Sequence, residues 1–79
     1  MIDARSQLDR QYQEMRWRIL SLAADFDRVE RLAGGRELVS NDARIASLKR
    51  CVEELLSTNP GRAERVQTIL SDKTPPPST

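Results

Sequence analysis

The sequence predicts an all-α protein: an antiparallel helical hairpin in which one long helix is followed by a return helix broken into two pieces. Three observations predict this fold. Apolar residues recur with helical spacing along most of the chain. Glycine and proline are confined to a few positions where helices can begin or end. The summed length of the two return helices also matches that of the first. We expect one helical domain over residues 1–73 and a disordered, Pro-rich tail over residues 74–79.

The first helix is predicted over residues 3–33, because large apolar side chains recur there at alternating intervals of four and three residues. This spacing is a heptad seam, which is typical of helices that pack side by side. The seam consists of Leu8, Tyr12, Met15, Ile19, Leu22, Phe26, Val29 and Ala33.

The ends of the first helix have recognisable signals. Asp3 or Ser6 can cap its start, because a side-chain oxygen there can accept hydrogen bonds from the first free N–H groups. Gly34 and Gly35 end it, since glycine readily adopts the left-handed conformation that follows a helix. Two ion pairs at i,i+4 are expected on its surface, Glu14–Arg18 and Asp27–Arg31.

Residues 34–41 are predicted to form a loop, and a second helix is predicted over residues 41–58. Ser40 or Asn41 can cap this helix, and Asp42 lies in its first turn, where the helix dipole favours an acid. The apolar seam of this helix is Ile45, Leu48, Val52 and Leu55, widened by Cys51 and Leu56.

A short third helix is predicted over residues 60–71. Asn59 serves as its cap and Pro60 occupies the first helical position, where the missing N–H of proline costs nothing. Its inward-facing residues are expected to be Ala63, Val66, Ile69 and Leu70.

The helix lengths favour one arrangement of these pieces. At 1.5 Å per residue the first helix is a rod of about 45 Å, and the other two span about 26 Å and 18 Å. Placed end to end they match the rod, so we expect the third helix to continue the second along the first. The alternative is a compact three-helix bundle in which the third helix folds sideways.

A helical hairpin of this size leaves much of its seam in water, because a small chain draws only about 3–5 kcal/mol from its own core. Trp17 and Leu20, with Ala24, lie on the side of the first helix away from its seam. We interpret them as a docking face for another chain, most simply in a homodimer that forms a four-helix bundle. The alternative is that the third helix, or the loop at Leu38 and Val39, covers this face within the monomer.

The composition excludes most catalytic chemistry. Histidine is absent and cysteine occurs once among the 79 residues. No imidazole base, Ser-His-Asp or Cys-His pair, or usual zinc or di-iron site can therefore be built. We expect no enzyme activity, no metal and no cofactor.

Three further features could suggest chemistry but have simpler explanations. Asp25 with Asp27, and Glu53 with Glu54, are the close carboxylate pairs, but side chains one or two residues apart on a helix point away from each other. Cys51 follows two cations that could lower its pKa. A buried, inert thiol is the commoner case, and we favour it here.

Nucleic-acid binding is the alternative function. Residues 45–71 can be interpreted as a helix-turn-helix, with candidate contact residues Arg62, Arg65, Gln67 and Thr68 on the second helix. Against this, the net charge is +1 and the pI is about 7.9, so the chain lacks the basic field that phosphate binding needs.

No apolar run exceeds three residues, so no membrane span is expected, and the first residues do not resemble a signal peptide. These features favour a cytoplasmic protein. We therefore predict a small, non-catalytic interaction or assembly module that acts by helix-face docking. The alternative is a small nucleic-acid-binding regulator.

Overall fold

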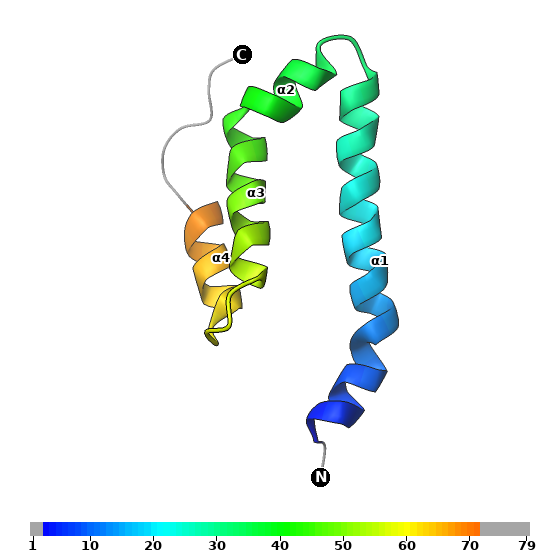
Figure 1. The fold of residues 1–79 in the computed structure, drawn as a ribbon, viewed down its shortest axis with the longest axis vertical. Helices are drawn as coiled ribbons and strands as arrows, with labels where there is room; N and C mark the ends of the chain where they lie inside the picture. The colour runs from blue at the N-terminus through cyan, green and yellow to red at the C-terminus, as the bar shows by residue number, and fades with distance from the viewer. Residues whose placement is uncertain (1–2, 72–79) are drawn as a thin grey trace.

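In this computed structural model, which describes residues 3–71, the protein is all-α, as predicted. Figure 1 shows a U-shaped path: one long helix forms the first arm, a short helix crosses the top, and two further helices form the second arm. The helices of the described part are α1 (Ala4–Arg31), α2 (Gly35–Asn41), α3 (Ala43–Leu55) and α4 (Arg62–Leu70).

Helix α1 begins where the sequence predicts and ends two residues early. Asp3 caps it, its carboxylate accepting a hydrogen bond of 2.8 Å from the backbone N–H of Ser6. This hydrogen bond favours the charged carboxylate and lowers the pKa of Asp3. The helix ends at Arg31, because Leu32 is extended and Gly34 adopts a left-handed conformation with φ of 77°.

The prediction of a loop over residues 34–41 is wrong, because most of this segment forms helix α2. The glycine pair ends α1 but also allows a new helix to start beside it. Gly35 is buried so closely against α1 that a Cβ there would lie 1.7 Å from the carbonyl oxygen of Val29. Arg36, Glu37 and Leu38 then favour helix, since all three residue types have high helix propensity.

Helix α3 is capped by Asp42, not by Ser40 or Asn41, which belong to α2. The Asp42 carboxylate accepts hydrogen bonds from the backbone N–H of Arg44 at 2.8 Å and from its guanidinium at 3.0 and 3.1 Å. The guanidinium, together with the backbone bond, lowers the pKa of Asp42. The helix ends at Leu55, three residues before the predicted end.

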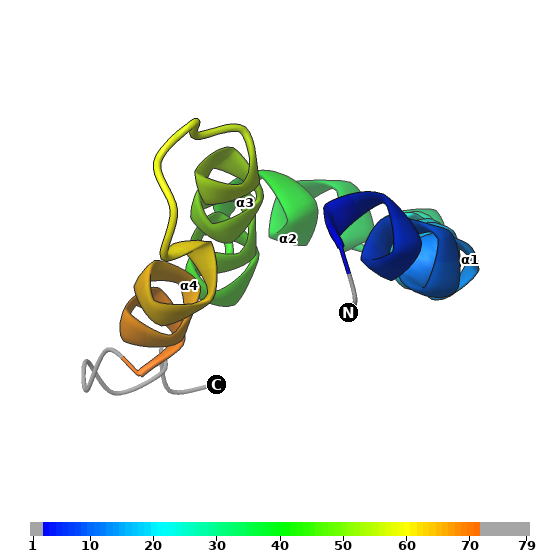
Figure 2. The ribbon, with the colours of Figure 1, turned by 90° about the horizontal axis from the view of Figure 1, so that it is seen from below.

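Helix α4 does not continue α3 as expected but turns back and lies beside it (Figures 1 and 2). Pro60 lies outside this helix. Gly61 immediately precedes the helix, and its left-handed φ of 87° helps to reverse the chain. The sideways alternative is closer to the structure, although among the helices of residues 3–71 α4 packs only on α3, and these helices form no compact bundle.

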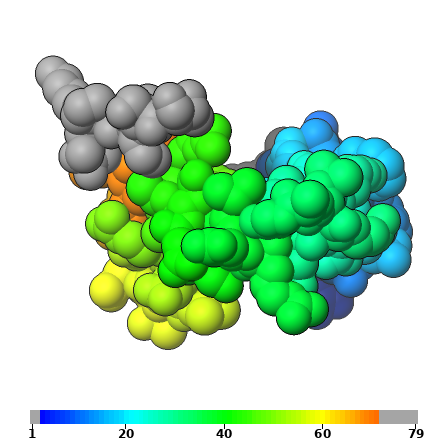
Figure 3. All heavy atoms as spheres, turned by 90° about the horizontal axis from the view of Figure 1, so that it is seen from above, coloured from blue at the N-terminus to red at the C-terminus, as the bar shows by residue number. Residues whose placement is uncertain are grey.

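The predicted hairpin contact between the two arms is not confirmed. Among residues 3–71, no Cα of α1 lies within 8 Å of a Cα of α3 or α4, while α2 packs against both α1 and α3. Figure 3 shows, from above, how the residues of α2 bridge the arms. Helix α2, in the segment predicted to be a loop, therefore holds the arms apart.

This arrangement buries little apolar surface. Within the described part only Gly35 and Cys51 are buried, and the N-terminal half of the heptad seam is exposed. The radius of gyration is 15.5 Å, whereas a compact chain of this length has about 12 Å. Little of the apolar surface of residues 3–71 is therefore covered by the chain itself.

Candidate interaction surface

The three predicted partner-binding residues lie on one side of α1, and we call them the Trp17 face. Trp17 is 68% exposed and Leu20 is 62% exposed, while the smaller Ala24 is half-buried. No residue of α3 or α4 approaches α1, so the interpretation in which the third helix covers this face within the monomer is wrong. Leu38 itself is 46% exposed and provides no shielded core for Trp17.

A shallow hollow on the surface of α1 adjoins the Trp17 face. Its lining is mostly apolar and comes from one helix alone: Gln13, Arg16, Trp17, Ile19, Leu20 and Ala23. The indole can therefore act as a projecting anchor beside a depression that accepts an apolar side chain of a partner.

Ion pairs along α1 restrain some of the charges around this face. Arg18 contacts Glu14 at 2.5 Å, as predicted. The predicted pair of Asp27 with Arg31 is absent from the described residues, which instead contain an Arg28–Asp25 pair at 2.6 Å. Both observed pairs are exposed and contribute only about 0.2–1 kcal/mol each. They still leave Asp27 without an ion pair within α1.

A second apolar surface of α1 is the N-terminal half of its heptad seam. Leu8, Tyr12, Met15 and Ile19 are 48–54% exposed. The C-terminal half, Leu22, Phe26 and Val29, is half-buried in the part of α1 near α2. The sequence predicts a seam that packs on the return helix and stays partly in water, and within the described residues only the half near α2 is covered.

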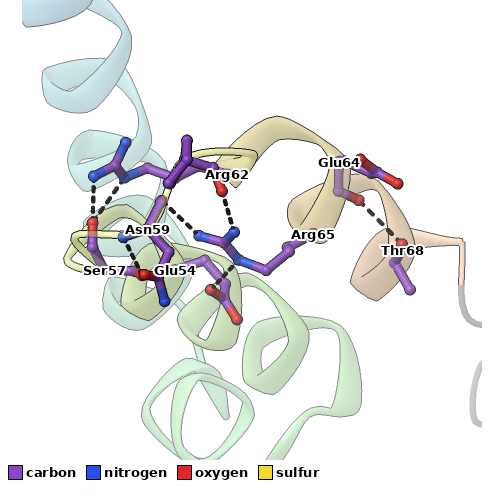
Figure 4. A network of polar contacts seen from close by, with 8 residues as sticks. Glu54, Ser57, Asn59, Arg62, Glu64, Arg65 and Thr68 are labelled. Atoms are coloured by element: carbon purple, nitrogen blue, oxygen red, sulfur yellow. Dashed lines mark hydrogen bonds and ion pairs between the residues drawn. The ribbon is translucent and has the colours of Figure 1, made fainter.

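The arginines of the nucleic-acid alternative are engaged in the turn between α3 and α4. Arg65 donates from Nε to a Glu54 carboxylate oxygen at 2.8 Å and from its two other nitrogens to the carbonyls of Pro60 and Asn59, at 2.7 and 3.2 Å. Arg62 donates two hydrogen bonds to the carbonyl of Ser57, the one from Nε at 2.9 Å. Figure 4 shows both guanidinium groups pointing into this turn. Their donors are thus used within the chain.

The other two residues of that alternative do not complete a contact surface with the arginines. Thr68 donates to the carbonyl of Glu64 at 3.0 Å, within its own helix. Gln67 is exposed and, with Thr68, lines a shallow hollow that also includes Glu64 and Ser71. An acidic residue in this hollow is unfavourable for a phosphate backbone.

The residues considered for chemistry are separated. Asp25 pairs with Arg28 and Glu54 pairs with Arg65, so neither adjacent carboxylate pair converges on one site. Cys51 is buried, as the sequence predicts for a cysteine beside the apolar seam. Across residues 3–71, no group of three or more His, Cys, Asp or Glu side chains is placed to hold a metal ion.

Sequence reasoning missed the face of α3 that packs on α4. Glu54, which pairs with Arg65 of α4, is half-buried there, whereas Val52 and Leu55 of the predicted seam are exposed. The spacing of apolar residues does not predict which face of α3 contacts α4, because this contact depends partly on the ion pair between Glu54 and Arg65.

Comparison with known proteins finds no matching family model, no similar curated protein and no similar solved structure. In the described part of the chain, no helix has the length and apolar character required to cross a membrane.

Proposed function

We propose that this chain is a small, non-catalytic assembly module that acts by helix-face docking, with α1 as the docking helix and the Trp17 face as its anchor. Its partner in this proposal is a second copy of the chain, which gives a homodimer. A two-fold pair of α1 helices, each with its own return arm, is the simplest such dimer. The predicted four-helix bundle would also need the return arms to pack on α1, from which they are separated within residues 3–71.

The observation that carries the proposal is the isolation of α1. Over its first four turns every residue is exposed, and no element among residues 3–71 packs on the Trp17 face. In proteins, a helix is stabilised mainly by the tertiary packing of its apolar face and less by the helix propensity of its residues. A helix of 28 residues with exposed apolar side chains on two sides therefore offers a surface that a partner can cover.

The amount of exposed surface supports the same conclusion. Several large apolar side chains of residues 3–71, among them Trp17, Leu20 and Leu32, are more than 60% exposed, and exposed apolar patches of this kind mark interaction surfaces. Trp and Arg are the residues most often found as energetic anchors at such interfaces. Both types are present here, since Arg16 lines the hollow that adjoins the Trp17 face.

The test is sedimentation equilibrium of the full chain at tens of micromolar. We expect a mass near twice 9.0 kDa. Trp17→Glu should raise the dimer dissociation constant by about thirtyfold or more, because loss of a central Trp anchor costs about 2 kcal/mol or more. Far-UV circular dichroism should show that the variant keeps its helical content, since Trp17 is 68% exposed and no helix of residues 3–71 packs on it.

Gln11→Glu is the matched control, because it introduces the same charge on the exposed surface of α1 about 120° around the helix from Trp17. It should leave the dissociation constant nearly unchanged. A wild-type chain that sediments at 9.0 kDa, or a Trp17→Glu variant that dimerises like the wild type, would contradict the proposal.

A further inference from the structure

The Trp17 face is the centre of a longer stripe with its own heptad spacing. We call it the docking stripe. Its residues recur at alternating intervals of four and three, and all but the half-buried Ala24 are exposed: Ser6, Arg10, Gln13, Trp17, Leu20, Ala24, Asp27 and Arg31. A heptad-spaced stripe of this kind is the geometry by which two helices pack along their length.

The charges on the docking stripe are arranged about its apolar centre. Arg10 lies two turns before Trp17, and Asp27 lies two turns after Leu20. Neither forms an ion pair within residues 3–71, so both are free to pair with another chain. The stripe is therefore basic toward its N-terminal end, apolar at its centre and acidic toward its C-terminal end, before Arg31.

We infer that two copies of this chain pair through antiparallel α1 helices in one register, with Trp17 packed on Leu20 of the second copy and Arg10 paired with Asp27 of the second copy. This inference rests on the proposed function. The symmetry is two-fold, so each contact occurs twice and the interface is self-complementary. The axis passes between residues 18 and 19, close to the middle of α1, so nearly the whole helix overlaps.

A parallel pairing of the same stripe is unfavourable. It would place Arg10 against Arg10 of the second copy and Asp27 against Asp27, because parallel helices juxtapose identical positions. Like charges held together at an interface oppose association. The antiparallel pairing turns the same four charges into two attractive pairs.

Neighbouring antiparallel registers are also unfavourable. A shift of one heptad in one direction packs Leu20 against Arg10 of the second copy, and a shift in the other direction packs Trp17 against Asp27. Each shift buries apolar surface against a charge and leaves the charge without its partner. The register centred on Trp17 and Leu20 alone matches apolar with apolar and basic with acidic residues.

The heptad seam on the other side of α1 is less suitable for pairing along the helix. Its last turns, at Leu22, Phe26 and Val29, are already half-buried, so a second copy could reach only its N-terminal half. The docking stripe is exposed from Arg10 to Arg31, apart from Ala24. Trp17 and Leu20 are also more exposed than any large residue of the seam.

The inferred register contains one unfavourable contact. Asp9 and Glu30, which flank the stripe, lie opposite each other across the two copies near the ends of the overlap. Glu30→Lys converts this contact into an attractive pair. The register therefore predicts that this variant binds its own copy more tightly, by about three- to tenfold.

The main test is a charge exchange measured by sedimentation equilibrium of the full chain. Asp27→Arg should raise the dimer dissociation constant by about tenfold or more, because two attractions become two repulsions. Arg10→Asp should have the same effect. The double variant Arg10→Asp/Asp27→Arg should restore the affinity to within about threefold of the wild type.

Glu53→Arg is the matched control for Asp27→Arg, since it makes the same charge change on an exposed residue of α3 that forms no ion pair in the described chain. It should not change the dissociation constant. Circular dichroism of each variant should show unchanged helical content, which separates a lost interface from a lost fold.

Spin labels give an independent measure of orientation. With Gln7→Cys labelled in a Cys51→Ala background, equivalent labels should lie about 35 Å apart along the antiparallel helices. A parallel dimer would place them about 10 Å apart. Two results would overturn the register and leave the proposed function standing. One is a dimer that loses affinity with Trp17→Glu but not with Asp27→Arg. The other is a separation of about 10 Å between the spin labels.

A different pattern would overturn both proposals. A dimer that Trp17→Glu leaves intact and Met15→Glu disrupts would place the interface on the heptad seam. A monomer at all concentrations would remove the second copy as partner.

Discussion

Gly35 lies directly against the backbone of Val29, where a Cβ on the glycine would be 1.7 Å from the carbonyl oxygen of Val29 and 2.9 Å from the Cα of Glu30. The obstacle is backbone, which cannot rotate away as a flexible side chain would. This contact sets the corner between α1 and α2, and α2 in turn sets the distance between the two arms of the U.

Gly35→Ala should therefore destabilise the corner. We expect a loss of about 1–3 kcal/mol in the free energy of unfolding, as for other substitutions that force the backbone to shift. Thermal unfolding followed by circular dichroism measures this loss. Gly34→Asn is the comparison: Gly34 has φ of 77° with open space around its Cα, and asparagine tolerates this conformation better than other residues. Equal effects of the two substitutions would show that the close approach at Gly35 is unimportant.

The α1–α2 corner also shows how far sequence reasoning reaches. The helical spacing of α1 and the glycines that end it are local features, and they were predicted to within two residues. Whether a glycine pair is followed by a loop or by another helix depends on the contact of Gly35 with Val29. That contact is tertiary, so the helix propensity of Arg36, Glu37 and Leu38 does not by itself distinguish α2 from a loop.

The turn between α3 and α4 depends on Arg65, which uses all three guanidinium nitrogens on Glu54, Pro60 and Asn59. Arg65→Lys keeps the charge but loses the planar fork that makes these hydrogen bonds together. We expect α4 to open more often, so that amide hydrogen exchange in α4 becomes about tenfold faster, since each hydrogen bond to a charged group contributes about 1.5–3 kcal/mol.

Arg50→Lys is the control for this effect, because Arg50 is exposed on α3 and forms no hydrogen bond or ion pair with the described residues. Unchanged exchange in α4 with Arg65→Lys would show that the apolar contacts of α4 suffice to hold it. The nucleic-acid alternative predicts a different phenotype, namely weaker binding to duplex DNA with no change in exchange.

Asp42 should make the stability of α3 depend on pH. Its pKa is lowered in the folded chain by the Arg44 guanidinium and the backbone N–H, so the unfolded chain binds a proton more readily. Stability from this cap is therefore complete above the ordinary aspartate pKa of about 4 and is lost as the pH falls through the lower folded value.

Asp42→Asn removes this pH dependence but keeps a good capping side chain. At neutral pH we expect a melting temperature within a few degrees of the wild type. Between pH 6 and 2 the melting temperature of the wild type should fall more steeply than that of the variant. A smaller pH dependence remains in both proteins, because the pKa of Asp3 is also lowered in the folded chain. Parallel melting-temperature curves for the two proteins would contradict the assignment.

The exposure of the Trp17 face was more predictable than the tertiary fold, for a physical reason. Helical phase alone places Trp17 and Leu20 on one side of α1, away from the heptad seam, and the structure leaves that side exposed. The packing of α4 on α3 was not predictable in this way. It uses a polar contact, Glu54 with Arg65, and turns Val52 and Leu55 toward solvent, although their spacing predicts burial.

Cys51 offers a chemical probe of that packing. Its side chain is 8% exposed, and it lies one turn before Glu54 on the face of α3 that contacts α4. A soluble aromatic disulfide reagent should therefore react with Cys51 only when α4 opens. Because Arg65→Lys raises the frequency of opening, it should accelerate the reaction by about tenfold, in step with the amide exchange of α4. The Gln7→Cys thiol on exposed α1 should react fast in either background. If Cys51 reacts as fast in the native chain as in denaturant, α4 does not shield it, and the contact of Glu54 with Arg65 has no role in burying the thiol.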